Sequence, residues 1–254
     1  ISDWLDLHIL TPNISKTKYL CFHNKKQHEN FTEAALNLKF RGITLERVDS
    51  CRLLGLILDE SLSFNKHIEE IQKKVIPFAY AVKRIRKSIS QKTALMLYFA
   101  FVQSRLIYMN IIWSAAPAYA MNMIEITQRK ALRILFNKDW FCSKRELYSI
   151  NILPVSTLCN VNLCLHAFKI SSNMVKNNIQ IRQVNDIHRY RTRTRENFVT
   201  PNYQTHLSNQ DFYVRAFNLF NSLPPLVKNK FSLNIFKTRI KEHFYESYCE
   251  INKM

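Results

Sequence analysis

The chain has 254 residues, of which 47% are hydrophobic and only two are glycine, and its formal net charge is +18. So little glycine argues against a glycine-rich phosphate loop and a turn-rich β-sandwich, and it favours long helices. The charge is neutral over residues 1–60 but reaches +10 over 61–150 and +8 over 151–254. This distribution predicts a polyanionic partner, with nucleic acid favoured over anionic lipid; a merely basic, soluble surface is the alternative.

Residues 1–60 have the pattern of a small α/β structure. A short helix is expected to end before the turn at Thr11-Pro12-Asn13. Apolar and polar residues then alternate over 36–40 and return over 43–48, which is the period of a strand. The apolar run 53–58 suits a buried strand, in which Gly55 marks a bulge or a close backbone approach. Together these segments predict a small antiparallel sheet.

Long helices are expected next. Apolar residues at steps of three and four predict a helix over 65–87, which Pro77 should kink or split. Ser90 is expected to cap a second helix from Gln91. The apolar pattern then reaches residue 113 on all sides, which predicts burial; a membrane span is rejected because Arg105 and two polar neighbours lie in its middle.

Further helices are expected over 120–136, 144–153, 158–172, 211–223 and 232–248, with a polar loop over 173–201. The predicted fold class is therefore α+β and mostly α, with a small antiparallel sheet at the N-terminal end followed by a basic helical bundle.

The six cysteines include no C-x-x-C pair. Cys159, Cys164 and His166 lie close together, but a fourth ligand at zinc spacing is missing. No metal site is therefore expected, and buried free thiols are the better interpretation. Free thiols indicate a reducing compartment, nuclear or cytoplasmic, and no secretion. The chain also starts at Ile1 without a methionine or a signal sequence, which suggests a fragment.

Six stretches occur in an order that resembles one known family. Each is loose by itself, but their order and spacing are specific. They are NISKTK (13–18), LLGLILDESLSFNKHI (53–68), AVKRIRKSIS…LYFAFVQSRLIYMNIIW (81–113), QRKALRI (128–134), HRYRTRTR (188–195) and AFNLFNSLPPLVKNKFSLNIFKTRIKEHF (216–244). Together they resemble the reverse transcriptases of non-LTR retrotransposons, of the jockey-like kind. Two departures are Met109-Asn110, where the family usually has a glycine, and Phe220, where it usually has tryptophan.

The resemblance implies the C-terminal part of an RNA-directed DNA polymerase encoded by a transposable element. Residues 1–62 would be the end of the palm with its primer-grip hairpin, 63–140 a helical thumb, and 141–254 a helical C-terminal region with a basic loop near 173–201. This chain has no Asp-Asp pair. The catalytic aspartates would therefore lie in an upstream polymerase domain of the same parent protein, so this chain would be inactive alone and hold no cofactor. Mg²⁺ would belong to the intact polymerase. The implied partners are an RNA template and a DNA primer, with no membrane.

The resemblance also implies roles for single residues. Lys16 falls where a lysine can protonate the leaving pyrophosphate. At Leu54-Gly55 the backbone would approach the primer 3′ end, which a Cβ would hinder. Phosphates would be held by Lys73, Lys74, Lys83, Arg84, Arg86, Lys87, Arg129, Lys130, Arg133, Arg189, Arg191, Arg193 and Arg195. For these cations a solvated helix face or a disordered basic loop is the alternative.

Two other functions fit the same sequence. A non-enzymatic, basic nucleic-acid-binding helical protein would need no preference for a recessed 3′ end. An interaction domain whose basic surface meets an acidic protein would bind that partner in preference to nucleic acid.

Overall fold

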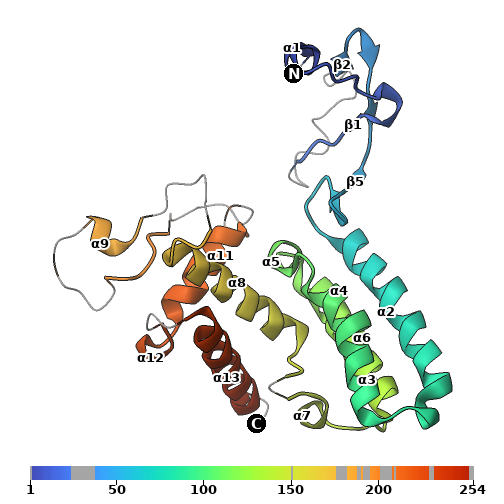
Figure 1. Cartoon of the computed structure of the whole chain (residues 1–254), viewed down its shortest axis with the longest axis vertical. Coiled ribbons are helices and arrows are strands. Elements are labelled where there is room, and N and C mark those ends of the chain that lie inside the picture. Colours follow the sequence, from blue (N-terminus) through green and yellow to red (C-terminus); the bar gives the residue numbers. More distant parts are fainter. Residues whose placement is uncertain are drawn as a thin grey trace. The chain divides into compact units, whose positions relative to one another are not determined.

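The computed structural model describes residues 2–23, 38–149, 151–175, 182–187, 190, 195–200, 208, 210–228 and 232–251 (Figure 1). The chain divides into two compact units, residues 1–69 and 70–254, and each is described by itself. The fold class is α+β and mostly α, as expected, because short strands are confined to the first unit and helices make up nearly all the ordered structure of the second.

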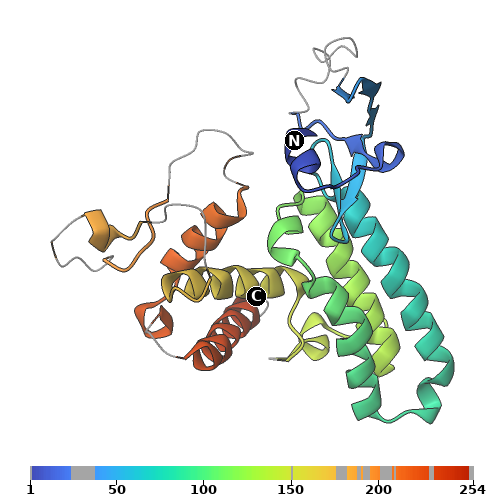
Figure 2. The same ribbon diagram turned by 45° about the horizontal axis from the view of Figure 1, so that its top comes forward.

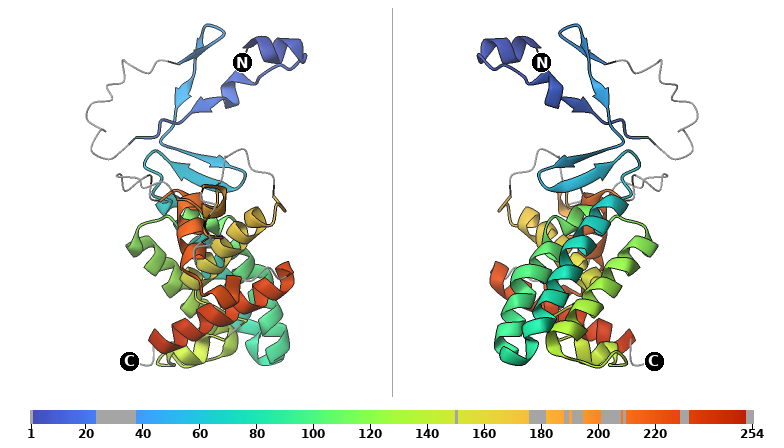
Figure 3. Two further views of the ribbon diagram at one scale, coloured as in Figure 1. Left: turned by 90° about the vertical axis from the view of Figure 1, so that its left-hand side faces the viewer. Right: turned by 90° about the vertical axis from the view of Figure 1, so that its right-hand side faces the viewer.

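The first unit opens with α1 (Ser2–Leu7) and a 3₁₀ turn at Ile14–Lys16. Its described strands are two to four residues long, and they form three separate two-stranded ladders in place of the single sheet expected (Figure 3). The pairs are β1 (Lys18–Tyr19) parallel to β4 (Glu46–Arg47), β2 (Lys39–Phe40) antiparallel to β3 (Ile43–Thr44), and β5 (Ser50–Leu53) antiparallel to β6 (Leu56–Asp59).

The buried strand expected over 53–58 is wrong, because the chain reverses inside it. Leu54 and Gly55 have φ values of +47° and +87° and form the two-residue turn between β5 and β6. Two central residues with positive φ are the signature of a tight hairpin turn that matches strand twist. Leu54 is 76% exposed at this turn, whereas Leu56 is buried.

The second unit begins within α2 (Asn65–Ile85), which continues through Pro77 without being split. A 3₁₀ turn at Arg86–Ser88 follows, and then α3 (Gln91–Leu97). The Ser90 cap is confirmed, because its Oγ accepts a hydrogen bond from the Thr93 amide at 3.1 Å. Helix α6 (Ala118–Phe136) packs against α3.

Between α3 and α6 the helix is irregular. A π-helical segment (Tyr98–Gln103) leads into α4 (Ser104–Ile107), and after a break comes α5 (Asn110–Trp113). The break lies at Met109, whose φ is +50°. The expectation that this segment is buried on all sides is wrong: Tyr98 is buried on the inner face, but Phe101 is 43% exposed on the outer one.

The remaining helices are α7 (Lys144–Leu147), α8 (Val155–Ser171), α9 (Val184–Ile187), α11 (Phe212–Ser222), α12 (Pro225–Lys228) and α13 (Leu233–Ile251). Helix α8 packs against both α11 and α13 (Figure 2). The Phe168 and Phe236 rings stack there, with centroids 4.2 Å apart. The helix expected over 144–153 stops at Leu147, because the Tyr148 backbone is extended (φ −108°, ψ 149°) and Ser149 then forms a β-bridge with Ile152.

Cys159 and Cys164 are buried free thiols on α8, as expected, and Phe220 is buried in the same core. Burial raises the pKa of Cys159 to about 12 and raises that of Cys164 further. Within the described ranges, no helix has both the length and the apolar content of a bilayer span.

Candidate nucleic-acid interface

The expected cations of α2 differ in their availability. Lys73, Lys83, Arg84 and Lys87 are exposed, and none of them forms an ion pair with another residue of the described part. Lys74 pairs with Glu70 one turn earlier, with Nζ and Oε1 3.0 Å apart. An exposed pair of this kind is weak and leaves the ammonium group accessible to another anion.

Arg86 has a different environment, because each of its three guanidinium nitrogens donates a hydrogen bond to an acceptor of the protein. Its Nε donates to the Leu135 carbonyl at 2.5 Å, its Nη1 to the Ile89 carbonyl at 3.0 Å, and its Nη2 to Gln91 Oε1 at 2.6 Å. Leu135 lies in the last turn of α6, where carbonyls lack intrahelical partners. Arg86 therefore joins the end of α6 to the start of α3, which is a structural role.

The expected cations of α6 are also partly engaged. Arg129 pairs with Glu125, at 3.6 Å between Nη1 and Oε2. Arg133 Nη2 donates to the Cys142 carbonyl at 3.3 Å, and its guanidinium carbon lies 5.2 Å from the centroid of the Trp140 ring. Lys130 Nζ lies 5.3 Å from the centroid of the Tyr80 ring on α2.

These contacts form a row of three cations and two exposed aromatic rings. Lys83 Nζ lies 6.0 Å from the Tyr80 ring centroid, on the same helix as that ring. Lys130 and Arg133 are three residues apart on α6 and so share a face. We define the cation–aromatic row as Lys83, Tyr80, Lys130, Arg133 and Trp140. Tyr80 is 44% and Trp140 62% exposed, so both rings have surface free for stacking.

Sequence reasoning found the cations of this row but missed its two rings. Tyr80 lies three residues before Lys83 on α2, a spacing that places the two side chains together on a helix. That signal was available in the sequence. Trp140 was not predictable in this way, because its position beneath Arg133 depends on how the chain turns after α6.

The β5–β6 hairpin is tied to the start of α2 within the first unit. The Ile57 amide donates to Nδ1 of buried His67 at 3.4 Å. His67 belongs to the same quoted stretch as Gly55. That stretch therefore forms one structural piece, in which a glycine turn is followed by a strand and by the helix that packs back onto it.

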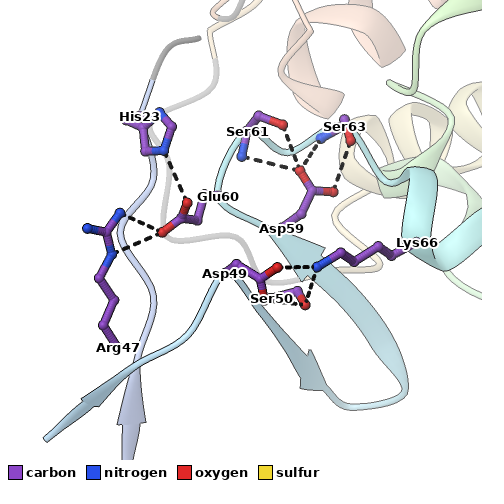
Figure 4. Close-up of polar contacts among 9 residues, drawn as sticks. All are labelled: His23, Arg47, Asp49, Ser50, Asp59, Glu60, Ser61, Ser63 and Lys66. Carbon is purple, nitrogen blue, oxygen red and sulfur yellow. Dashed lines mark hydrogen bonds and ion pairs between the residues drawn. The ribbon is translucent and has the colours of Figure 1, made fainter. Parts of the chain in front are cut away.

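Asp59 holds the connection between β6 and α2 (Figure 4). Its Oδ1 accepts the Ser61 and Ser63 amides at 3.2 and 2.9 Å, and its Oδ2 accepts the Phe64 amide at 2.8 Å. Both serine hydroxyls also donate to it. Burial would raise the pKa of Asp59, but these hydrogen bonds outweigh burial and lower it.

Two ion pairs surround this connection (Figure 4). Glu60 Oε1 accepts from Arg47 Nη2 at 2.8 Å, and Lys66 Nζ lies 2.5 Å from Asp49 Oδ2. The pKa of Glu60 is lowered because hydrogen bonds from Arg47 and His23 outweigh its burial. The cations Arg47 and Lys66 near the hairpin are therefore paired with carboxylates of the protein itself.

Lys16 is exposed at the end of the 3₁₀ turn Ile14–Lys16. Asn13 Oδ1 accepts the Lys16 amide at 3.2 Å, and Thr17 Oγ1 donates to the Asn13 carbonyl at 2.9 Å. The Asn, Lys and Thr of the first quoted stretch thus build one capped turn.

Of the basic loop near 173–201, Arg189, Arg191 and Arg193 lie outside the described residues. Arg195 is exposed, and its carbonyl accepts the Asn185 amide at 3.0 Å. The loop is anchored to α11, because Asn221 bonds both the amide and the carbonyl of Phe198 at 2.9 Å.

The described residues do not fit a catalytic Mg²⁺ site. They contain no group of three or more His, Cys, Asp or Glu side chains arranged to hold a metal ion. Asp3 and Asp6 lie on α1, and Asp6 Oδ1 pairs with Arg41 Nη2 at 2.5 Å. The Asp6 carboxylate is therefore engaged in an ion pair within the first unit.

Two curated proteins are similar to parts of this chain. The first is the "Probable RNA-directed DNA polymerase from transposon X-element" of Drosophila melanogaster, 23% identical over 150 residues, which are 58% of this chain and 16% of that protein. The second is the "RNA-directed DNA polymerase from mobile element jockey" of Drosophila funebris, 26% identical over 112 residues, or 42% and 12% of the two chains. No protein-family profile and no solved structure matches.

These matches confirm the resemblance to non-LTR retrotransposon reverse transcriptases that the motifs indicated. The chain is reverse-transcriptase-like, and the matched segment spans about a sixth or less of each relative.

Proposed function

We propose that this chain is the part of a non-LTR retrotransposon reverse transcriptase that holds the primer–template duplex by its phosphate backbone. RNA-directed DNA synthesis would be the activity of the longer protein, with the catalytic aspartates and Mg²⁺ upstream of residue 1. The chain itself would bind an RNA template paired with a DNA primer.

The cation–aromatic row is the observation that supports this proposal most. Lys83 and Lys130 come from two helices and converge on one exposed ring, Tyr80. Lysines of this kind contact phosphates without reading sequence, and the ring adds a stacking surface. Further exposed cations are Lys73 and Arg84 on α2 and Lys87 in the 3₁₀ turn that follows it.

The test is binding of a recessed RNA–DNA primer–template, blunt duplex DNA and heparin across a salt series. We expect a preference for the recessed hybrid that persists at raised salt. The double variant Lys83→Gln/Lys130→Gln should weaken binding of all nucleic-acid sequences alike and reduce the magnitude of the salt slope by about 2.

The matched control is Lys237→Gln/Lys241→Gln, which removes the same charge from α13. Equal losses in the two double variants would mean that only net charge matters, and the proposal would then be wrong. The proposal would also be wrong if all three ligands bound equally and lost affinity together as salt is raised, because that result requires only a basic surface.

Two further roles belong to this proposal. Lys16 would act as the general acid for pyrophosphate in the longer protein, since its ammonium group is exposed on a capped turn. The Leu54-Gly55 turn would approach the primer end with its backbone. Both roles predict that primer extension by the longer polymerase is reduced. Lys16→Ala should slow the chemical step, and Gly55→Val should weaken the affinity for the primer.

A second candidate is a basic nucleic-acid-binding protein without polymerase function. It is supported by the same cation–aromatic row, because phosphate contacts and base stacking need no catalytic group. It differs in the binding experiment by showing no preference for a recessed 3′ end.

A further inference from the structure

The turn between α6 and α7 exposes two neighbouring aromatic side chains. Trp140 is 62% and Phe141 is 91% exposed, which leaves the Phe141 ring almost wholly in water. We call this pair the aromatic tip. Large apolar side chains that lie side by side on a surface are unfavourable in isolation and mark sites of contact with another molecule.

Backbone hydrogen bonds constrain the turn that carries the aromatic tip. Helix α6 ends with Asn137 at φ +51°, and the Lys138 amide donates to the Arg133 carbonyl at 2.9 Å, a common helix-ending motif. The Cys142 amide then donates to the Asp139 carbonyl at 3.2 Å. A tip ordered in this way loses little conformational entropy on binding.

The charges around the aromatic tip are mainly positive. Arg133 lies against the Trp140 ring, and Lys138, Lys144 and Arg145 are exposed in the same segment. Asp139 is the acidic residue of the turn itself, and Glu146 is engaged by the Ser143 hydroxyl at 2.9 Å. The surroundings therefore complement an anion that also has flat apolar faces.

A cavity of about 350 Å³ opens beside this segment. Phe136, Leu147 and Ile152 give it apolar walls, while Lys138, Ser149 and Asn151 add polar groups. A nucleobase needs this combination of an apolar face and hydrogen-bonding edges.

We propose that the aromatic tip binds unpaired nucleotides of a single-stranded nucleic acid, by stacking bases on Trp140 and Phe141 while nearby cations hold the phosphates. Alternating rings and cations are typical of single-strand binding without sequence readout. The inference rests on the proposed nucleic-acid interface, because Trp140 belongs to both the aromatic tip and the cation–aromatic row and lies against Arg133. It adds to that interface a contact with the strand beyond the duplex.

The intrinsic fluorescence of Trp140 provides the test. The chain has three tryptophans, of which Trp113 is buried and Trp4 is exposed, so a Trp4→Phe background leaves Trp140 as the exposed reporter. Titration with the oligonucleotides dT15 and U15 should quench it through stacking. Phe141→Ala should weaken their binding roughly fivefold to thirtyfold, and Leu226→Ala, an exposed apolar change on α12, should leave it unchanged.

Other outcomes would overturn the proposal. Absence of quenching, or equal effects of Phe141→Ala and Leu226→Ala, would exclude base stacking. Binding to phosphatidylserine vesicles with no binding of dT15 would identify the aromatic tip as a membrane contact. Binding of blunt duplex DNA separates this inference from the proposed function. The affinity for blunt duplex should fall in the Lys83→Gln/Lys130→Gln variant, but in Phe141→Ala it should stay within about twofold of the wild-type affinity.

Discussion

The side-chain amide of Gln128 donates a hydrogen bond to the hydroxyl of Tyr98 at 2.9 Å, from a position with no solvent exposure. The same nitrogen donates to the Leu153 carbonyl at 2.8 Å, and Oε1 accepts the Val155 amide at 3.0 Å. Gln128 thereby joins α6 to the π-helical segment and to the start of α8. Sequence reasoning placed it in a basic motif and gave it no part in the core.

We expect Gln128→Leu to lower the free energy of unfolding by about 3 kcal/mol or more, because it leaves the Leu153 carbonyl and the Val155 amide buried without partners. Gln72→Leu is the matched control, since Gln72 is half-buried and bonds Thr127 Oγ1 at 2.8 Å. It should cost about 1 kcal/mol. Urea unfolding followed by circular dichroism measures both, and similar losses would contradict the central role of Gln128.

Substitution of Arg84 should affect nucleic-acid binding, whereas substitution of Arg86 should affect the stability of the fold. Arg86→Gln removes bonds to the ends of two helices and should cost about 1–3 kcal/mol of stability. Arg84→Gln should leave the midpoint of thermal unfolding unchanged and lower affinity for duplex nucleic acid. Thermal unfolding and salt-dependent binding of both variants check this, and a stable Arg86→Gln protein would refute the helix-joining role.

Asp59→Asn should destabilise the first unit by about 1–2 kcal/mol at neutral pH, because the amide cannot accept hydrogen bonds on both sides. The folded pKa of Asp59 is lowered, so its contribution is present above the ordinary carboxyl pKa and is lost as the pH falls through the folded value. Hydrogen exchange in β5 and β6 should therefore show a wild-type advantage that shrinks below about pH 4. Asp49→Asn, which removes only an exposed surface pair, should destabilise the first unit less than Asp59→Asn does at neutral pH.

The hairpin turn predicts opposite results for its two residues. Gly55→Ala should destabilise the hairpin by about 1–2 kcal/mol, since its φ is +87°. Leu54→Gly removes a side chain from a left-handed position and should leave the hairpin at least as stable. If Leu54 also contacts a primer, Leu54→Gly will reduce affinity without loss of protection in hydrogen exchange of β5 and β6. Reduced protection in that variant would show that the Leu54 side chain supports the fold.

The helices with strong apolar spacing could be predicted from the sequence, and so could the Ser90 cap. The hairpin turn could not, because leucine rarely adopts positive φ and an unbroken apolar run resembles a buried strand. Met109 stands where the family usually has a glycine, and its backbone is left-handed, with φ +50°. The departure from the family pattern thus fell on a left-handed position, which the sequence alone did not indicate. In the candidate site, the positions of the cations could be predicted from the sequence. The structural role of Arg86 and the place of Trp140 against Arg133 could not, because both depend on tertiary packing.

The two thiols on α8 are enclosed in the core with raised pKa values, so reagents that need a thiolate will not modify them readily. The half-buried cysteines include Cys51 on β5 and Cys142 beside Phe141. With Cys21, Cys249 and one of this pair replaced by serine, a fluorophore or spin label can be attached to the other. The native sequence thus supplies one attachment point beside the hairpin turn and one beside the exposed rings, and each can report on bound nucleic acid without alteration of the core.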